Sequence, residues 1–144
     1  MIIRKMTTED VPEIAAIEEA SFSDPWSADA VRSYLAKPFG GLVAEEEGRV
    51  AGYLLYVSLF ETADLDDLAV GEPYRRKGIA KALMAEFLSS VRENGAREVF
   101  LEVRRGNESA IRLYRGCGFT DVRIRKEYYV SPVEDAVVMR RALG

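Results

Sequence analysis

The chain has 144 residues and a mass of 16.1 kDa, the usual size of one domain, so we expect a single domain over residues 1–144. It has one cysteine and no histidine, which excludes a disulfide framework and the nucleophile and zinc sites that need imidazole. The net charge of −4 argues against direct nucleic-acid binding, and no apolar run predicts a membrane span or an export signal, so we expect a cytoplasmic location.

The first half of the chain predicts two helices and four strands. Apolar residues at 2–6 predict a short strand, and Thr7-Thr8-Glu9-Asp10 supplies the start of a helix over about 8–20. A proline in segment 22–27 ends this pattern, and Ser27 is typical of the N-cap of a second helix that runs through Leu35. Residues 40–44, 50–59 and 63–70 predict three successive strands, with a turn at 46–48.

The second half begins with the clearest helix, which is predicted over 76–94 and ends at Asn94-Gly95. A strand over 99–103 follows, then a helix that Asn107 caps and that ends at Gly116 or Gly118, and last a hairpin over 119–130 and 134–142. This order combines antiparallel neighbours with two helical crossovers. We therefore predict an α/β (α+β) fold with a mixed, mostly antiparallel sheet and helices on both faces.

Charge is distributed unevenly along the chain. Residues 1–74 carry 5 basic and 15 acidic side chains, whereas residues 75–144 carry 15 basic and 9 acidic ones, which predicts separate sites for a cation and an anion. The segment Arg75-Arg76-Lys77-Gly78-Ile79-Ala80-Lys81 places basic and small residues at a helix start, where unpaired backbone N–H groups favour an anion. It matches neither a Walker loop nor a dinucleotide fingerprint. A solvated basic helix start is the alternative.

Two motifs in the second half resemble those of the GNAT superfamily of acyl-CoA-dependent N-acyltransferases. The pattern Q/R-x-x-G-x-G/A occurs from Arg75 to Ala80, and N-x-x-A-x-x-x-Y-x-x-x-G-F occurs from Asn107 to Phe119. The resemblance implies acetyl-CoA as co-substrate, with no metal. The coenzyme contacts that it implies come from Leu68, Ala69, Val70, Arg75, Arg76, Lys77, Gly78, Ile79, Ala80, Lys81 and Asn107.

A finer resemblance is to the RimI type of this superfamily, the N-terminal alanine acetyltransferases of a small-subunit ribosomal protein. It rests on Phe22-Ser23-Asp24-Pro25-Trp26-Ser27, on Leu101-Glu102-Val103-Arg104 and on Tyr128-Tyr129 followed by Glu134-Asp135-Ala136. The chain departs from this type at Ala80, where many relatives have a second glycine, and at Val130, where proline is expected. The resemblance implies the N-terminus of a protein, such as a ribosomal protein, as acceptor, in a groove lined by Phe22, Trp26, Tyr34, Tyr128 and Tyr129.

Two residues are candidates for acid–base chemistry. Glu102 lies within an apolar strand, where a carboxylate is out of place unless it is paired, as with Arg104 or Arg97, or used. Tyr114 lies on the apolar stripe of a helix, where a core aromatic with a satisfied hydroxyl is the alternative. The resemblance implies that Glu102 is the general base, acting through water, and that Tyr114 protonates the leaving thiolate.

Other features favour plainer explanations. Cys117 lies between two glycines and has no histidine to activate it, so we expect a small buried thiol. Asp64, Asp66 and Asp67 do not follow the regular alternation of a strand, which argues against a metal site. We predict that they form a solvated acidic face at a strand edge. Two alternative functions remain open: an acetyltransferase of the same fold that acts on lysine side chains or a small amine, and a non-catalytic module that binds coenzyme A and another protein.

Overall fold

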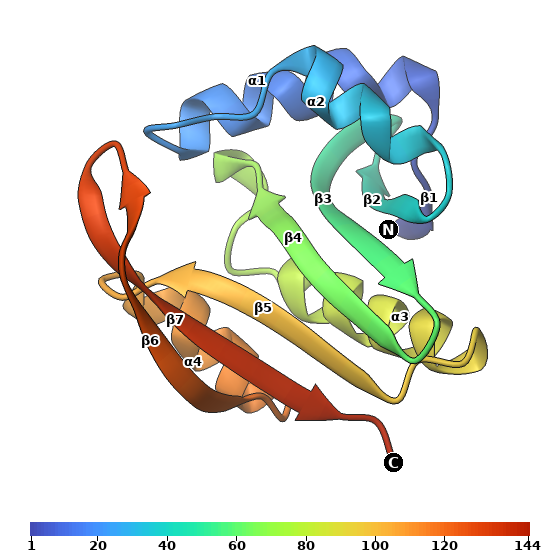
Figure 1. The fold of residues 1–144 in the computed structure, drawn as a ribbon. Helices are drawn as coiled ribbons and strands as arrows, with labels where there is room; N and C mark the ends of the chain where they lie inside the picture. The colour runs from blue at the N-terminus through green and yellow to red at the C-terminus, as the bar shows by residue number, and fades with distance from the viewer.

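A seven-stranded sheet runs through the computed structural model, which describes residues 1–144 (Figure 1). The strand order is β1-β2-β3-β4-β5-β7-β6, and only the β4–β5 pair is parallel. This confirms the predicted mixed, mostly antiparallel sheet. The strands are β1 (Ile2–Lys5), β2 (Phe39–Glu46), β3 (Arg49–Leu59), β4 (Thr62–Val70), β5 (Glu98–Arg104), β6 (Thr120–Val130) and β7 (Val133–Ala142).

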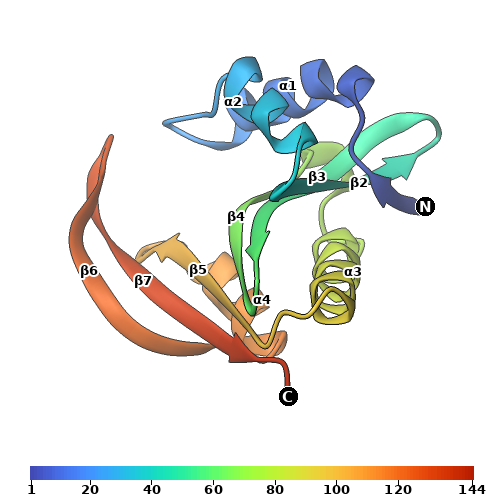
Figure 2. The same ribbon diagram turned by 45° about the vertical axis from the view of Figure 1, so that its right-hand side comes forward.

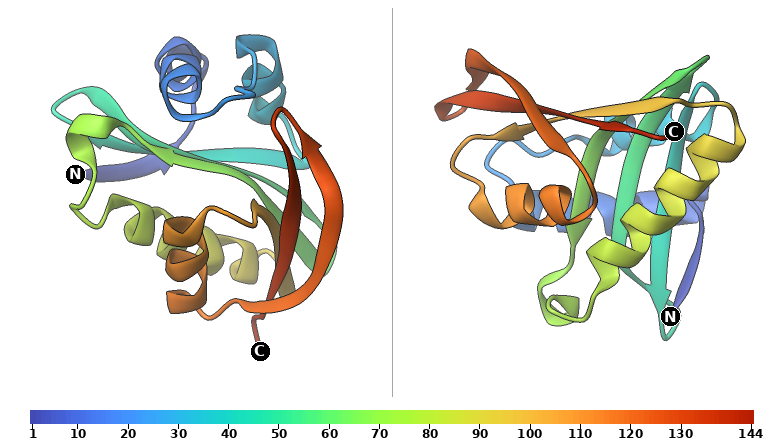
Figure 3. Two further views of the ribbon diagram at one scale, coloured as in Figure 1. Left: turned by 90° about the vertical axis from the view of Figure 1, so that its left-hand side faces the viewer. Right: turned by 90° about the horizontal axis from the view of Figure 1, so that it is seen from below.

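Helices cover both faces of the sheet, with α1 and α2 on one face and α3 and α4 on the other (Figure 3). Their bounds are α1 (Val11–Ser21), α2 (Ala28–Arg32), α3 (Ile79–Glu93) and α4 (Glu108–Gly116). The helices predicted over 8–20 and through Leu35 each include a short 3-10 turn, at Thr8–Asp10 and Ser33–Leu35. None of the helices is long and apolar enough to cross a membrane.

The longest helix begins three residues later than predicted. Gly78 precedes it with a left-handed φ of 79°, and Arg76 has a φ of 65°, so the segment before Ile79 forms a turn and not a first helical turn. From Ile79 onward the apolar stripe is regular, and Leu83, Met84 and Phe87 are fully buried against the sheet.

Two apolar cores lie on opposite sides of the sheet. The larger one has 22 buried residues and joins the sheet to α3 and α4, whereas the smaller has 10 and joins it to α1 and α2. Tyr53 is fully buried in the smaller core, and Phe119 belongs to the larger. Because each helix pair has its own core, the two faces together form a three-layer structure.

The sheet divides between β4 and β5. Their parallel pairing extends only from Thr62 with Glu98 to Leu65 with Leu101. Beyond this point β4 stays with β3 as far as Val70, and β5 stays with β7 as far as Arg104. The two halves of the sheet diverge, as Figure 2 shows. The edge of β4 after Leu65 therefore has no strand partner on the β5 side.

A β-bulge in β4 changes the direction of its acidic side chains. Leu55 of β3 is opposite Asp67, and Tyr56 is opposite Leu65, so Asp66 is the extra residue. Both Asp66 and Asp67 consequently line the same pocket, next to Glu18 of α1. The predicted position at a strand edge is wrong, because β4 lies between β3 and β5; Asp64 and Asp66 are exposed as predicted, but Asp67 is half-buried and borders a cavity together with Asp66.

Candidate active site

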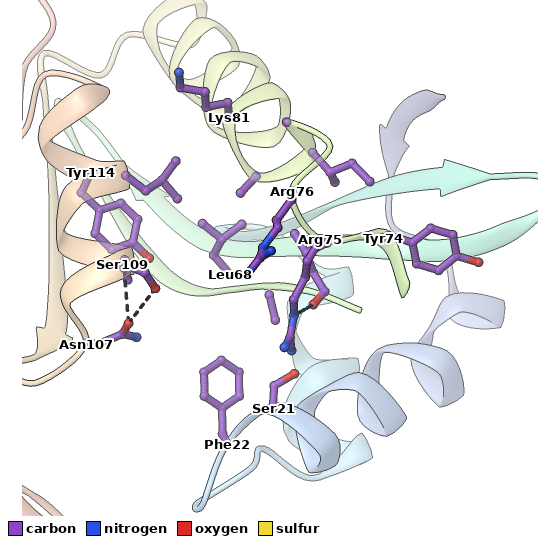
Figure 4. A pocket seen from close by; sticks show the side chains of 17 residues that line it. Ser21, Phe22, Leu68, Tyr74, Arg75, Arg76, Lys81, Asn107, Ser109 and Tyr114 are labelled. Carbon is purple, nitrogen blue, oxygen red and sulfur yellow. Dashed lines mark hydrogen bonds between the residues drawn. The ribbon is translucent and has the colours of Figure 1, made fainter. Parts of the chain in front are cut away.

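A cleft of about 670 Å³ lies between the end of β4, the start of α3 and the start of α4 (Figure 4). Its volume is within the range of small-molecule sites. It is lined by ten of the eleven residues predicted to contact a coenzyme: Leu68, Ala69, Val70, Arg75, Arg76, Gly78, Ile79, Ala80, Lys81 and Asn107. Lys77 does not line it, because its side chain extends over the ring of Tyr74, with Nζ 6.0 Å from the ring centroid.

The start of α3 forms an anion-binding surface in this cleft. No side chain caps the helix, so its first backbone N–H groups are available to a ligand. A Cβ atom at Gly78 would meet no atom within 4 Å, which leaves open space above these amides. Arg75 and Arg76 border the same space, and Arg75 Nε donates to the carbonyl of Val70 at 3.0 Å. The residues present therefore suit a ligand with a diphosphate.

The start of α4 forms the opposite wall. The Asn107 side chain accepts hydrogen bonds from the backbone N–H of Ala110 at 3.3 Å and from the Ser109 hydroxyl at 3.4 Å, which confirms its predicted role as N-cap. Tyr114 projects from α4 toward the cleft (Figure 4), and its hydroxyl makes no hydrogen bond within the chain. The Tyr114 ring is a buried member of the larger core, as the alternative expects, but no group of the chain pairs with its hydroxyl. Burial raises the pKa of Tyr114, so the phenol keeps its proton.

Two smaller pockets continue from this cleft through the gap between β4 and β5. The first, of about 180 Å³, shares Phe22, Leu68 and Tyr114 with the large cleft and adds Trp26 and Glu102. The second, of about 380 Å³, shares Trp26 and Glu102 with the first and shares no lining residue with the large cleft. We call the 180 Å³ space the inner pocket and the 380 Å³ space the outer pocket.

All the residues predicted for the acceptor groove line these two pockets. Phe22, Trp26 and Tyr129 border the inner pocket, while Tyr34 and Tyr128 border the outer one. The Trp26 and Tyr34 rings also contact each other, with centroids 5.2 Å apart. The structure thus joins the predicted coenzyme side and the predicted acceptor side through one passage, with Tyr114 at one end of the inner pocket.

Glu102 lies at the junction of the inner and outer pockets. Its Oε1 accepts a hydrogen bond from Arg125 at 3.3 Å, and its Oε2 is buried without a partner. Neither of the predicted alternative partners pairs with it, because Arg104 pairs with Asp24 and Glu134. A buried, unpartnered carboxylate oxygen is costly, and here it is available to a water or an amine in the pocket.

A group of carboxylates that we did not predict for the site lies beside Glu102. Glu18 of α1 is fully buried, and it accepts hydrogen bonds from the Trp26 backbone N–H at 3.0 Å and from the Tyr53 hydroxyl. Asp66 accepts a bond from the Tyr34 hydroxyl at 2.6 Å. Burial, with a smaller contribution from Glu18, raises the pKa of Asp67 well above its usual range. Glu18 follows Ile14 and Ile17 on the inward side of α1, and a carboxylate in that position was the available sequence signal.

Comparisons with known proteins agree with this geometry. The model of the acetyltransferase (GNAT) family matches residues 11–119. A [ribosomal protein bS18]-alanine N-acetyltransferase of Escherichia coli is 30% identical over 139 residues, which cover 95% of this chain and 94% of that protein. The crystal structure of the ribosomal-protein-S18-alanine N-acetyltransferase from Escherichia coli superposes with a TM-score of 0.92 at 28% identity, over 99% of this chain and 94% of that one. Ard1 from Thermoplasma volcanium superposes with a TM-score of 0.90 at 30% identity, over 98% and 96% of the two chains.

Proposed function

This chain belongs to the GNAT acetyltransferase family and uses acetyl-CoA, and we propose that its acceptor is the α-amino group of a protein N-terminus. One observation carries the proposal: a large cleft and a narrow inner pocket meet between the diverging strands β4 and β5, with Tyr114 and Glu102 both on the inner pocket. A donor from one side and an acceptor from the other can meet only there.

The donor occupies the large cleft. The diphosphate of acetyl-CoA lies against the first N–H groups of α3, where the helix dipole and the side chains of Arg75 and Arg76 favour its charge. The acyl end points along β4 into the inner pocket. There, the unpaired edge of β4 at 68–70 offers backbone groups to the thioester carbonyl, a contribution of the oxyanion-hole type.

The transfer is a direct one, with no covalent enzyme intermediate. The α-amine nitrogen attacks the thioester carbon, so that an N–C bond forms and the C–S bond breaks. The amine loses one proton to Glu102, through a water molecule, and the departing thiolate takes one proton from Tyr114. The raised pKa of Tyr114 keeps the proton on the phenol until the thiolate forms. Proton exchange with water then restores both side chains.

An α-amine suits this pocket better than a lysine. Its ordinary pKa of about 7.7 to 8.0 is far below the value of about 10.4 for lysine, so a much larger fraction of it is already neutral near pH 7, and Glu102 then has only the one proton of the transfer step to accept. The carboxylates of Glu18 and Asp66 border the inner pocket and favour a cationic acceptor on arrival, whereas the half-buried Asp67 keeps its proton. At about 180 Å³, the inner pocket is also about a quarter of the size of the donor cleft, which favours a small first residue.

The relatives indicate which protein carries the acceptor. The Escherichia coli relative is named for alanine acetylation of ribosomal protein bS18, and it matches this chain along nearly its whole length. We therefore propose a ribosomal protein that begins with alanine as the substrate, and a cytoplasmic site of action. The acidic first half of the chain would attract the basic surface of such a protein.

The test is to incubate the protein with acetyl-CoA and three sets of acceptors: peptides beginning with Ala or Ser, the same peptides with a blocked terminus and internal lysines, and polyamines. Mass spectrometry records which atom is modified. We expect acetylation at the free terminus and none after blocking. Modification of a lysine in the blocked peptide would favour the lysine or small-amine alternative. Coenzyme binding without any transfer, even to intact ribosomal particles, would favour the non-catalytic alternative.

A further inference from the structure

Two segments that are more than 100 residues apart meet over the inner pocket. One is the loop over 22–27, between α1 and α2, which carries Trp26; the other is the tip of the β6–β7 hairpin over 130–134. In Figure 1 the blue loop and the orange tip approach each other at the same side of the molecule. The two segments belong to different layers, since α1 and α2 pack in the smaller core and β6 is exposed along its length.

Arg104, the last residue of β5, joins these two segments. Its guanidinium donates to Asp24 Oδ2 at 3.3 Å on the loop and to Glu134 Oε1 at 3.1 Å on the hairpin. It also donates to the carbonyls of Pro132 at 2.9 Å and Ser131 at 3.2 Å. A guanidinium has five N–H groups in a planar fork, which lets one side chain hold several acceptors at once.

Two further contacts complete this arrangement, which we call the Arg104 clasp and define as Arg104, Ser23, Asp24, Ser131 and Glu134. The Ser23 hydroxyl donates to the Ser131 carbonyl at 2.8 Å. The Arg104 guanidinium also lies 4.3 Å from the centroid of the Tyr129 ring, so it fixes one aromatic wall of the inner pocket. The Arg104 side chain is only 20% exposed, so its ion pairs are better shielded from solvent than ordinary surface pairs.

The clasp borders the space in which the acceptor's first residue must lie. Arg104, Asp24 and Tyr129 all line the inner pocket, as do Glu102 and Tyr114. The amine must reach this pocket for transfer, so the side chain on the same carbon atom enters it too. Since the clasp holds the loop and the hairpin together, it also sets how far Trp26 and Tyr129 can move apart.

We propose that Arg104 determines the specificity for the first residue, because the clasp keeps the inner pocket too narrow for a large side chain. The inference rests on the proposed function. Without the clasp, the loop and the hairpin can separate, and the pocket accepts larger first residues. The donor cleft does not include Arg104, so acetyl-CoA binding is unaffected.

The experiment compares peptides that differ only in the first residue, Ala, Leu or Phe, on the wild type and on Arg104→Met, which keeps the apolar stem without the guanidinium. We expect the ratio of kcat/KM for Ala over Leu to fall at least tenfold in the variant, with an unchanged Kd for acetyl-CoA. Arg104→Lys should give an intermediate ratio, since one ammonium cannot hold both segments. Arg115→Met is the matched control, because Arg115 pairs with Asp121 and lines none of the three pockets.

A second variant, Asp24→Ala, breaks the clasp from the loop side and gives the answer if Arg104→Met does not fold. A ratio within twofold of the wild type in the folded variant would overturn the inference. Acetylation of the Ala peptide at its terminus by the wild type is the internal standard for the proposed function. Its absence would overturn the proposed function and this inference with it, whereas its presence together with an unchanged ratio overturns the inference alone.

Discussion

The carboxylate of Glu18 accepts a hydrogen bond from the backbone N–H of Trp26 at 3.0 Å, across the turn that leaves α1. Its other oxygen accepts the Tyr53 hydroxyl, so both oxygens of this fully buried group are used. Glu18 is therefore a positioning residue for the 22–27 loop. It reaches from the first helix to the aromatic wall of the acceptor pocket without contacting the donor cleft.

Replacing Glu18 by Gln should loosen this loop. The amide group offers one acceptor in place of two, so either the Trp26 N–H or the Tyr53 O–H loses its acceptor. Leaving one such buried donor unpaired costs about 1 to 3 kcal/mol of stability. We expect the KM for an N-terminal peptide to rise several-fold with an unchanged Kd for acetyl-CoA. Trp26 is the single tryptophan, so its emission should shift to longer wavelength as the ring gains solvent.

The matched control is Glu19→Gln, which changes the exposed neighbour on the same helix. It should leave the stability, the peptide KM, the Kd for acetyl-CoA and the Trp26 emission at wild-type values. If Glu18→Gln lost stability while the peptide KM and the Trp26 emission stayed constant, the positioning role would be excluded and a purely structural one would remain.

Gly78 is the position where the donor cleft is most easily blocked. A glutamate there places a bulky anion over the first N–H groups of α3. The positive φ of 79° at Gly78 adds backbone strain for any residue with a side chain. We expect Gly78→Glu to lower acetyl-CoA affinity at least tenfold by calorimetry. Gly48→Glu is the control: Gly48 has nearly the same φ, 78°, and open space around it, but it lies in the turn between β2 and β3. Equal affinity in the two variants would remove the anion site from the mechanism.

Tyr114→Phe and Glu102→Gln test the two ends of the inner pocket. Each variant removes one proton-transfer group and keeps the side-chain shape, so we expect turnover to fall roughly 100- to 10,000-fold with little change in acetyl-CoA affinity. Single-turnover kinetics and calorimetry measure the two effects separately. Near-normal turnover would reassign the residue to a packing role, and an equal loss of coenzyme affinity would make it a binding group.

Most of the fold followed from local patterns, because helix starts, turns and apolar spacing are properties of short segments. The predicted start of the long helix at 76 was wrong because positive φ angles at Arg76 and Gly78 are set by the turn and not by apolar spacing. Ten of the eleven residues that the resemblance assigned to coenzyme contacts line one cleft, since most of them lie in continuous stretches of sequence.

The acidic part of the acceptor site could not be predicted in the same way. The bulge at Asp66 depends on the register of β4 with β3, and a change of one residue in register reverses the faces of a strand. The Arg104 clasp joins Arg104 to Asp24 and Glu134, which are 80 and 30 positions away in the sequence, so no local pattern indicates it. Both features arise from how distant segments pack, and both lie on the acceptor side.

Asp67 gives the protein a pH dependence of stability that can be measured. In the unfolded chain an aspartate ionises near pH 3.9, whereas burial and the nearby Glu18 hold the proton on Asp67 to a much higher pH in the folded protein. Between these pH values the folded state binds more protons than the unfolded state, so the free energy of unfolding falls as pH rises.

Asp67→Asn keeps the shape of the side chain and removes the titration, so the free energy of unfolding of this variant should change less between pH 4.5 and 8. The stability of Asp67→Asn relative to the wild type should therefore increase steadily from pH 4.5 to 8, because only the wild type loses stability through this titration. Denaturant titrations at each pH measure this, with Asp29→Asn as the control because Asp29 is 93% exposed. Parallel profiles for the wild type and Asp67→Asn would show that Asp67 ionises in the folded protein as it does in the unfolded chain.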